Sequence, residues 1–223
     1  MVDPTEISAA RHESLLQAAF GVFLRYGYKK TSMDDLARAA GLSRQGLYLH
    51  FANKDALFND PDSPVAGNPM GDVTVVEFFD YHCPYCKAVA APLNQLIQED
   101  KGVRLVLKEF PILGEDSILA SHAALASVGQ GKYWAFHQAL MEHRGKFDMD
   151  VIKSIATKVG IDPVKLEADM GQQQIEPMIS ANHTLARTLD LNATPTFIIG
   201  DQVIEGAVPL ERLKEIIKQV RGS

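Results

Sequence analysis

The spacing of hydrophobic residues changes near residue 60. Before that point, apolar residues recur every three or four positions and predict one buried face of a helix. These residues are Leu15, Leu16, Ala19, Phe20, Phe23 and Tyr26. Beyond it, β-branched and aromatic runs at 73–80 and 104–110 predict strands, with helical spacing at 88–97 between them. Two runs that flank Gly200-Asp201 predict a hairpin. The pattern therefore predicts an α/β fold preceded by a small all-α segment.

Residues 31–58 carry the signals of a helix-turn-helix. Ser32-Met33-Asp34-Asp35 predicts a capping box, in which the hydroxyl accepts from a free amide and the acid three residues on reaches back. We expect Gly41-Leu42 to form the turn and Ser43 to cap a helix over about residues 44–50. In this arrangement the second helix enters the major groove of DNA and its first residues meet base edges.

Candidate DNA-binding residues follow from this geometry. Ser43 begins the second helix, and Arg44 and Gln45 can each read a base with two hydrogen bonds. The residues placed to meet phosphates are Thr31, Tyr48, His50 and Lys54. The alternative is that these helices only pack on the rest of the chain. Residues 1–57 hold seven Lys/Arg and six Asp/Glu, a balance of +1, which attracts phosphates weakly.

A stretch rich in proline and glycine over residues 59–71 favours turns and marks a domain boundary. We expect a helix-turn-helix domain over 1–58 and a second domain over 59–223. The 223 residues carry a net charge of −6 and are 46% hydrophobic, as in ordinary globular proteins. No apolar run approaches the ~18 residues that span a bilayer. Residues 1–17 lack the pattern of a signal peptide, so we expect a cytoplasmic location.

The sharpest chemistry lies in Cys83-Pro84-Tyr85-Cys86, which follows a predicted strand and opens a predicted helix. The first turn of a helix has free amides and a positive dipole end, and both stabilise a thiolate. We therefore expect Cys83 to be the attacking, more exposed thiol and Cys86 to resolve the mixed disulfide. A zinc half-site and two unreactive core cysteines are the alternatives. Structural zinc usually takes four Cys/His ligands, and the chain has only two cysteines.

Glu77 lies six residues before Cys83 on the same strand alternation as Val75 and Phe79. A partly buried carboxylate near the thiols would have a raised pKa and could relay protons as Cys86 is deprotonated. Lys108, on the adjacent predicted strand, is a possible partner for it. The alternative is that Glu77 and Lys108 are ordinary strand charges that face water.

Two family resemblances cover most of the chain. The segment TSMDDLARAAGLSRQGLYLHFANKDALF resembles the DNA-binding segment of TetR-family repressors, over about residues 8–58. The segments VVEFFDYHCPYCK, LKEFPILG, YWAFHQALM and ATPTFIIGDQVIEGA resemble, in that order, the DsbA family of thiol–disulfide oxidoreductases, over about residues 60–221. The second resemblance implies a thioredoxin-like fold with a helical insertion over about 112–189. It also implies a Glu77–Lys108 pair and a cis-proline loop at Thr194-Pro195.

Together these features predict dithiol–disulfide exchange with cysteine-containing protein substrates, at a surface around Cys83, Thr194 and Pro195. We expect no metal and no organic cofactor. The DsbA resemblance implies re-oxidation by a quinone-coupled membrane oxidase in the periplasm or another extracytoplasmic space. In the cytosol, the thioredoxin or glutathione system would keep the pair reduced. The alternatives are a redox-responsive transcriptional regulator that binds DNA through residues 1–58, and an artificial fusion of two uncoupled parts.

Overall fold

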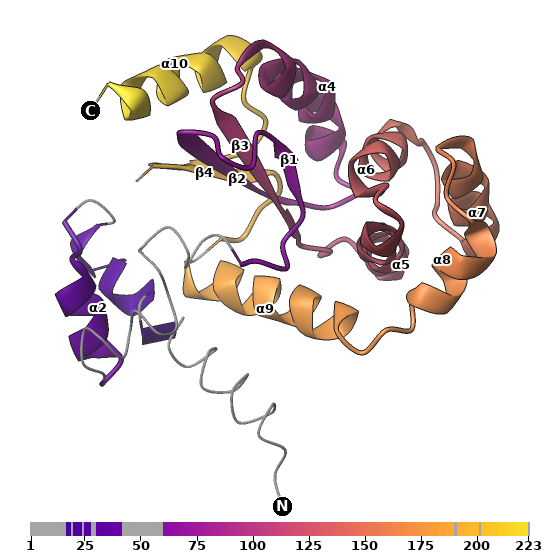
Figure 1. Ribbon diagram of the computed structural model, residues 1–223, viewed down its shortest axis with the longest axis horizontal. Coiled ribbons are helices and arrows are strands. Elements are labelled where there is room, and N and C mark those ends of the chain that lie inside the picture. The colour runs from indigo at the N-terminus through magenta and orange to yellow at the C-terminus, as the bar shows by residue number, and fades with distance from the viewer. Residues whose placement is uncertain are drawn as a thin grey trace, which may run out of the picture. The chain divides into compact units, whose positions relative to one another are not determined.

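The computed structural model describes residues 17–18, 20–23, 25–27, 30–41, 60–189, 191–200 and 202–222 (Figure 1). Contacts divide the chain into two compact units. One comprises Met1–Asp62 with Thr184–Asn192, and the other comprises Ser63–His183 with Ala193–Ser223. The domain boundary expected between residues 58 and 59 stays a prediction, because residues 42–59 lie outside the described part. Among the described residues, every helix is too short or too polar to cross a bilayer.

The first unit contains a helix that ends at a glycine and a second helix that begins with the predicted capping box. The described residues between 17 and 26 are helical, and Gly27 follows them with a φ of 76°, the conformation glycine favours at a helix end. Helix α2 (Met33–Ala39) begins with the predicted capping box. The Ser32 hydroxyl accepts from the Asp35 amide, and the Asp35 carboxylate accepts from the Ser32 amide.

A five-stranded sheet in the order β1-β3-β2-β4-β5 forms the centre of the second unit. The strands are β1 (Val65–Gly67), β2 (Val73–Phe79), β3 (Val103–Glu109), β4 (Thr196–Ile199) and β5 (Gln202–Glu205). Strands β2 and β3 are parallel, and the other neighbouring pairs are antiparallel. Helix α4 (Pro84–Glu99) supplies the crossover that a parallel pair requires. Strands β4 and β5 form the predicted hairpin.

Helices occupy most of the chain between β3 and β4. They are α5 (Glu115–Ala126), the 3₁₀ turn η2 (Ser127–Gln130), α6 (Tyr133–Glu142), α7 (Met149–Lys158), α8 (Pro163–Asp169) and α9 (Ile175–Thr188). Helix α10 (Leu210–Arg221) follows β5. In Figure 1, α4 and α10 lie on one side of the sheet, and α5 and α6 gather near the ends of β2 and β3. The α/β sheet with inserted helices is the fold that the sequence predicts.

Strand alternation decides which side chains face α4 and α10. Successive side chains of a strand point to opposite faces of the sheet. Val75 and Phe79 of β2 and Leu105 of β3 share one hydrophobic core with Leu93 of α4 and Ile216 of α10. Glu77 lies between Val75 and Phe79 on the same face. This core places the end of β2 beneath the start of α4, where the two cysteines lie.

Candidate active site

Two thiols lie at the junction between β2 and α4. Cys83 caps the N-terminus of α4, and Pro84 takes the first helical position, where a missing amide proton costs nothing. Cys86 lies in the first turn and is fully buried, whereas Cys83 is 4% exposed. Both are free thiols. Cys83 is therefore the more accessible sulfur, as the attacking role requires.

Hydrogen bonds to its sulfur make Cys83 acidic. The Cys86 thiol, the Thr194 side chain and the backbone amides of Cys86 and Tyr85 favour the thiolate and outweigh the opposing effect of burial. They lower the pKa of Cys83 from 9.0 to about 5, so this thiol is ionised at neutral pH. Burial raises the pKa of Cys86 far above its usual range, and the hydrogen bond to Cys83 and the Glu77 charge act in the same direction. At pH 7 the site therefore holds one thiolate and one thiol.

A loop from the other end of the chain covers the Cys83 sulfur. The Thr194–Pro195 peptide bond is cis, as the resemblance implies. In the neutral thiol form, Cys83 Sγ donates to the Thr194 carbonyl oxygen at 3.1 Å. The Gly206 amide donates to the Pro195 carbonyl at 2.7 Å and fixes this loop on the β4–β5 hairpin. The structure thus brings together Cys83, Cys86, Thr194 and Pro195.

Glu77 is a buried acid coupled to both sulfurs. Its side chain is 1% exposed, and its Oε2 has no hydrogen-bond partner. Burial raises the pKa of Glu77 to about 8, and the negative charges of Glu109 and Cys83 raise it too. At neutral pH this carboxyl group is mostly protonated, so it can supply a proton to a leaving thiolate. The alternative that Glu77 faces water is wrong.

Lys108 is not the partner of Glu77, so the predicted pair is wrong. The parallel register aligns Glu77 with Leu107 and Phe78 with Lys108. Because side chains alternate along a strand, Lys108 leaves the sheet on the face opposite to Glu77. Its ammonium group is buried there and donates to Ser63 Oγ at 2.7 Å. Lys108 therefore does not face water. Its side chain lies on the face of the sheet opposite to Glu77, so it does not act on the thiols.

The residue after Lys108 is a second buried acid that sequence reasoning missed. Glu109 lies on the same face of the sheet as Glu77 and is 1% exposed. Its Oε1 accepts from the Tyr81 hydroxyl at 3.1 Å and from the Tyr133 hydroxyl at 2.7 Å, and its Oε2 accepts from Ser121 Oγ at 2.7 Å. Burial raises the pKa of Glu109 to about 8 against the effect of these hydrogen bonds. Two buried carboxyl groups therefore lie behind the cysteine pair.

His137 closes this buried polar cluster. Its Nδ1 lies 3.1 Å from the Tyr81 hydroxyl, and its ring stacks on Tyr133 and Trp134. Burial lowers the pKa of His137 to about 3, so the ring is neutral. It is a buried histidine with a hydrogen-bond partner at Nδ1. The described ranges contain no group of three or more His, Cys, Asp or Glu side chains that could bind a metal ion.

Asp80 anchors the loop that carries the cysteines, a role that sequence reasoning did not assign. The side chain is fully buried. One carboxylate oxygen accepts from the His82 amide at 2.6 Å and from Ser117 Oγ at 2.7 Å. The other accepts from the amides of Ile112 and Leu113 at 2.8 and 2.9 Å. The end of β2 is thereby fixed to the loop after β3 and to the start of α5.

Only one of the predicted DNA contacts lies in the described part of the chain, and its prediction is wrong. Thr31 is 2% exposed, and its hydroxyl donates to the Gly27 carbonyl at 2.8 Å. This hydroxyl closes the preceding helix and does not face outward to a phosphate. The other candidates lie outside the described residues, and their roles stay predictions. These are Ser43, Arg44, Gln45, Tyr48, His50 and Lys54.

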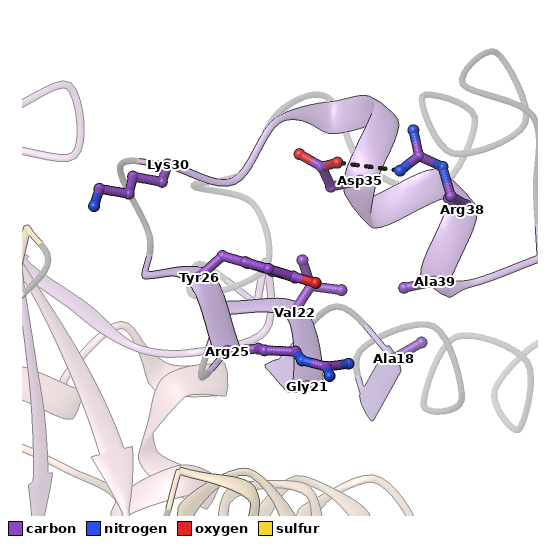
Figure 2. Close-up of a pocket in the computed structure, with 9 residues that line it drawn as sticks. All are labelled: Ala18, Gly21, Val22, Arg25, Tyr26, Lys30, Asp35, Arg38 and Ala39. Carbon is purple, nitrogen blue, oxygen red and sulfur yellow. Dashed lines mark ion pairs between the residues drawn. The ribbon is translucent and has the colours of Figure 1, made fainter.

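Positive side chains surround a pocket of about 460 Å³ in the first unit (Figure 2). Arg38 pairs with Asp35, three residues earlier on α2, at 3.5 Å. The Arg25 guanidinium lies 5.9 Å from the ring centroid of Tyr26. Tyr26 is 54% exposed, so its predicted place on the buried helix face is wrong. The pocket is lined by Ala18, Gly21, Val22, Arg25, Tyr26, Lys30, Asp35, Arg38 and Ala39.

Known proteins match the chain in two separate parts. Residues 15–60 match the family model described as bacterial regulatory proteins, tetR family. Disulfide bond formation protein D of Bacillus subtilis is 31% identical over 75% of this chain and 83% of its own length. Na(+)/H(+) antiporter NhaA 1 of Salinispora arenicola is 26% identical over 71% of this chain, which spans only 25% of that protein.

Solved structures agree with the match to the disulfide bond formation protein. The crystal structure of a thioredoxin-like oxidoreductase from Silicibacter pomeroyi DSS-3 is 46% identical to this chain. The match covers 77% of this chain and 99% of that one, with a TM-score of 0.73. Residues 74–218 also match the family model described as DSBA-like thioredoxin domain. With its thiolate at a helix N-terminus beside a cis-proline loop, the chain belongs to this family of DsbA-like thioredoxin-fold proteins.

Proposed function

We propose that the chain exchanges the Cys83–Cys86 dithiol or disulfide with cysteine-containing protein substrates. One observation carries the proposal: Cys83 occupies the N-cap position of α4, its thiol is ionised at neutral pH, and Cys86 is buried one turn further along the helix. A thiolate of low pKa is both an attacking group and a good leaving group. Because ionisation stabilises the reduced form, it favours the direction in which the chain oxidises its substrates.

The reaction in that direction has two steps. A substrate thiolate attacks Cys83 Sγ of the Cys83–Cys86 disulfide, and the Sγ–Sγ bond breaks. Cys86 leaves as a thiolate and takes up a proton, for which the protonated Glu77 is the buried source. A second substrate thiolate then attacks the substrate sulfur of the mixed disulfide, and Cys83 leaves as a stable thiolate. The substrate gains a disulfide, and the two electrons remain on the Cys83–Cys86 dithiol.

Which partner re-oxidises the cysteine pair depends on the cellular compartment that holds the protein. A quinone-coupled membrane oxidase would accept the two electrons in an extracytoplasmic space. The thioredoxin or glutathione system would instead hold the pair reduced in the cytosol. The name of the Bacillus subtilis relative, a disulfide bond formation protein, supports the oxidising direction.

The regulator hypothesis has less support from the geometry. Cys83 and Cys86 lie in one helical turn at the start of α4, so closing their disulfide leaves the helix in place. A DNA switch would need a larger movement. DNA affinity measured with and without reductant tests the hypothesis, and an unchanged affinity would remove it.

The proposed function is tested by oxidation of a dithiol peptide and by reduction of insulin. We expect wild type to be active, Cys83→Ser to be inactive in both assays, and Cys86→Ser to accumulate a mixed disulfide with insulin, because Cys83 attacks an insulin disulfide and no Cys86 thiol is present to resolve the product. Equal activity of wild type and Cys83→Ser would overturn the assignment.

A further inference from the structure

A cleft of about 360 Å³ opens beside the residues that flank Cys83 in sequence. His82 and Pro84, the two sequence neighbours of Cys83, form one wall. The loop that follows α6 forms the other wall. The cleft is lined by His82, Pro84, Lys87, Arg144, Gly145 and Lys146. Segments about 60 positions apart in sequence thus meet beside the two residues that flank Cys83.

The cleft concentrates positive charge in a chain whose net charge is −6. Lys87 Nζ donates to the His143 carbonyl at 2.5 Å, and Arg144 donates to three backbone carbonyls at 2.8 to 3.2 Å. Carbonyl oxygens hold these groups in place but do not neutralise them. In the described part of the chain, Lys87, Arg144 and Lys146 have no carboxylate within 4.0 Å, the limit for an ion pair.

Nearby acids leave this charge largely uncompensated. Asp116 lies 3.5 Å from His82 Nε2 and is directed to that ring. Asp80 is buried and accepts four hydrogen bonds, although its charge reaches Lys87 weakly. The cleft therefore offers cations to an incoming anion.

We propose that this cleft binds a carboxylate of the substrate, close to the cysteine that exchanges with Cys83. The inference rests on the proposed function and adds a substrate class to it. Thiol substrates with an acidic residue near their cysteine would be preferred over neutral or basic ones. The carboxylate can belong to a polypeptide or to glutathione, and the experiment below separates the two.

Helix geometry sets the distance between the acid and the cysteine of the substrate. The Lys87 amide donates to the Cys83 carbonyl at 3.1 Å, so the two residues lie one turn apart on one side of α4. Four residues of helix rise about 6 Å. An extended substrate advances about 3.3 Å per residue and directs every second side chain to the same face. An Asp or Glu two positions from the substrate cysteine therefore matches the axial spacing between Cys83 and Lys87, a residue that lines the cleft.

The experiment compares peptides that differ at one position. Rates of mixed-disulfide formation are measured for Cys peptides with Asp, Asn or Lys two residues from the cysteine, at low and high salt. We expect wild type to react about threefold faster with the Asp peptide than with the Asn peptide, and more slowly with the Lys peptide, because an exposed ion pair has this strength. High salt should reduce the difference.

Variants locate the effect in the cleft. Lys146→Gln removes an exposed cation of the cleft and should reduce the ratio of the rate with the Asp peptide to the rate with the Asn peptide. Lys158→Gln, at the end of α7, removes an exposed lysine that does not line the cleft and should leave the preference intact.

The possible outcomes separate this inference from the proposed function. Equal wild-type rates with the Asp and Asn peptides, together with equal rates for glutathione and its dimethyl ester and with normal exchange, would overturn the cleft assignment and leave the function standing. Failure of all peptides to react would overturn the function itself. If glutathione reacts faster than its dimethyl ester while the peptides do not differ, the ligand of the carboxylate site is a small thiol.

Discussion

Glu77→Gln should stabilise the protein while slowing its chemistry. Glu77 is 1% exposed, and its Oε2 has no hydrogen-bond partner. Burial raises its pKa from 4.5 to about 8 in the folded chain, whereas in the unfolded chain it ionises near the ordinary value. Glutamine has the shape of the protonated acid and never ionises. The substitution therefore removes a cost that the wild type carries at neutral pH.

The sign and size of the effect follow from proton linkage. Below the unfolded pKa, both states hold the proton and Glu77 costs nothing. As the pH rises from 4.5 to 8, the unfolded chain loses the proton and the native chain keeps it, so wild-type stability falls. Each pH unit costs about 1.4 kcal/mol, so the sum between the unfolded pKa and pH 7 is about 3 kcal/mol. The gain from Glu77→Gln should be near zero at pH 4 and reach about this value at pH 7.

Denaturant unfolding of the reduced protein at pH 4 and pH 7 measures this gain. Trp134, the single tryptophan, packs against the core of the second unit and reports its unfolding. Glu205→Gln changes an exposed glutamate of β5 and serves as the matched control, with no expected pH-dependent gain. The reasoning would be refuted if the stability gain of Glu77→Gln over wild type were no larger at pH 7 than at pH 4.

The same substitution should slow disulfide exchange at pH 7 about tenfold, because the buried proton source is gone. An unchanged exchange rate would remove Glu77 from the mechanism.

Three further predictions follow from the buried groups around the thiols. Glu109→Gln removes a negative charge that faces Glu77 and should lower the pH at which the infrared carbonyl band of protonated Glu77 disappears; a band that stays in place contradicts the coupling. Asp80→Ala leaves four donors without their acceptor and should lower the free energy of unfolding by about 3 kcal/mol or more. Ser117→Ala, which removes one of those donors, should cost about 1 kcal/mol, and equal losses in the two variants would count against the role of Asp80. The reduction potential of the Cys83–Cys86 pair should fall by about 59 mV per pH unit below pH 5, where both sulfurs bind a proton on reduction. Above pH 5 it should fall by about 30 mV per unit, because Cys83 stays a thiolate and only Cys86 binds a proton. A uniform slope through pH 5 would contradict this.

The cysteine site could be predicted from the sequence because its parts are local. A strand, a C-x-x-C pair and a helix follow one another directly, and helix geometry alone places Cys83 at the positive end of the dipole. The cis-proline loop lies more than 100 residues away, at Thr194-Pro195, and needed the family resemblance to be connected with the cysteines. Its position against the Cys83 sulfur comes only from the structure.

The acid pair shows where local reasoning failed. Lys108 and Glu109 are adjacent, and only the register between β2 and β3 decides which of them shares a face with Glu77. The pattern within a single strand does not contain that register. A shift by one residue exchanges the two faces of a strand, so the sequence of β3 alone does not decide whether Lys108 or Glu109 shares a face with Glu77.

The hydrogen bonds of Asp80 and the cationic cleft were missed for a related reason. Both join the end of β2 or the start of α4 to loops that lie far along the chain. Asp80, Lys87 and Arg144 look like ordinary charged residues in sequence. They gain their roles from the helices inserted between β3 and β4, which bring these loops back to the cysteines.

The ionisation of Cys83 tests the central claim most directly. Thiolate absorbance at 240 nm, or the rate of alkylation by iodoacetamide, is followed from pH 3 to pH 10 on the reduced protein, with Cys83→Ser as the blank. The account predicts one titration with a midpoint near pH 5, while Cys86 stays protonated across this range. A midpoint near that of a free thiol, about 8.5, would contradict it.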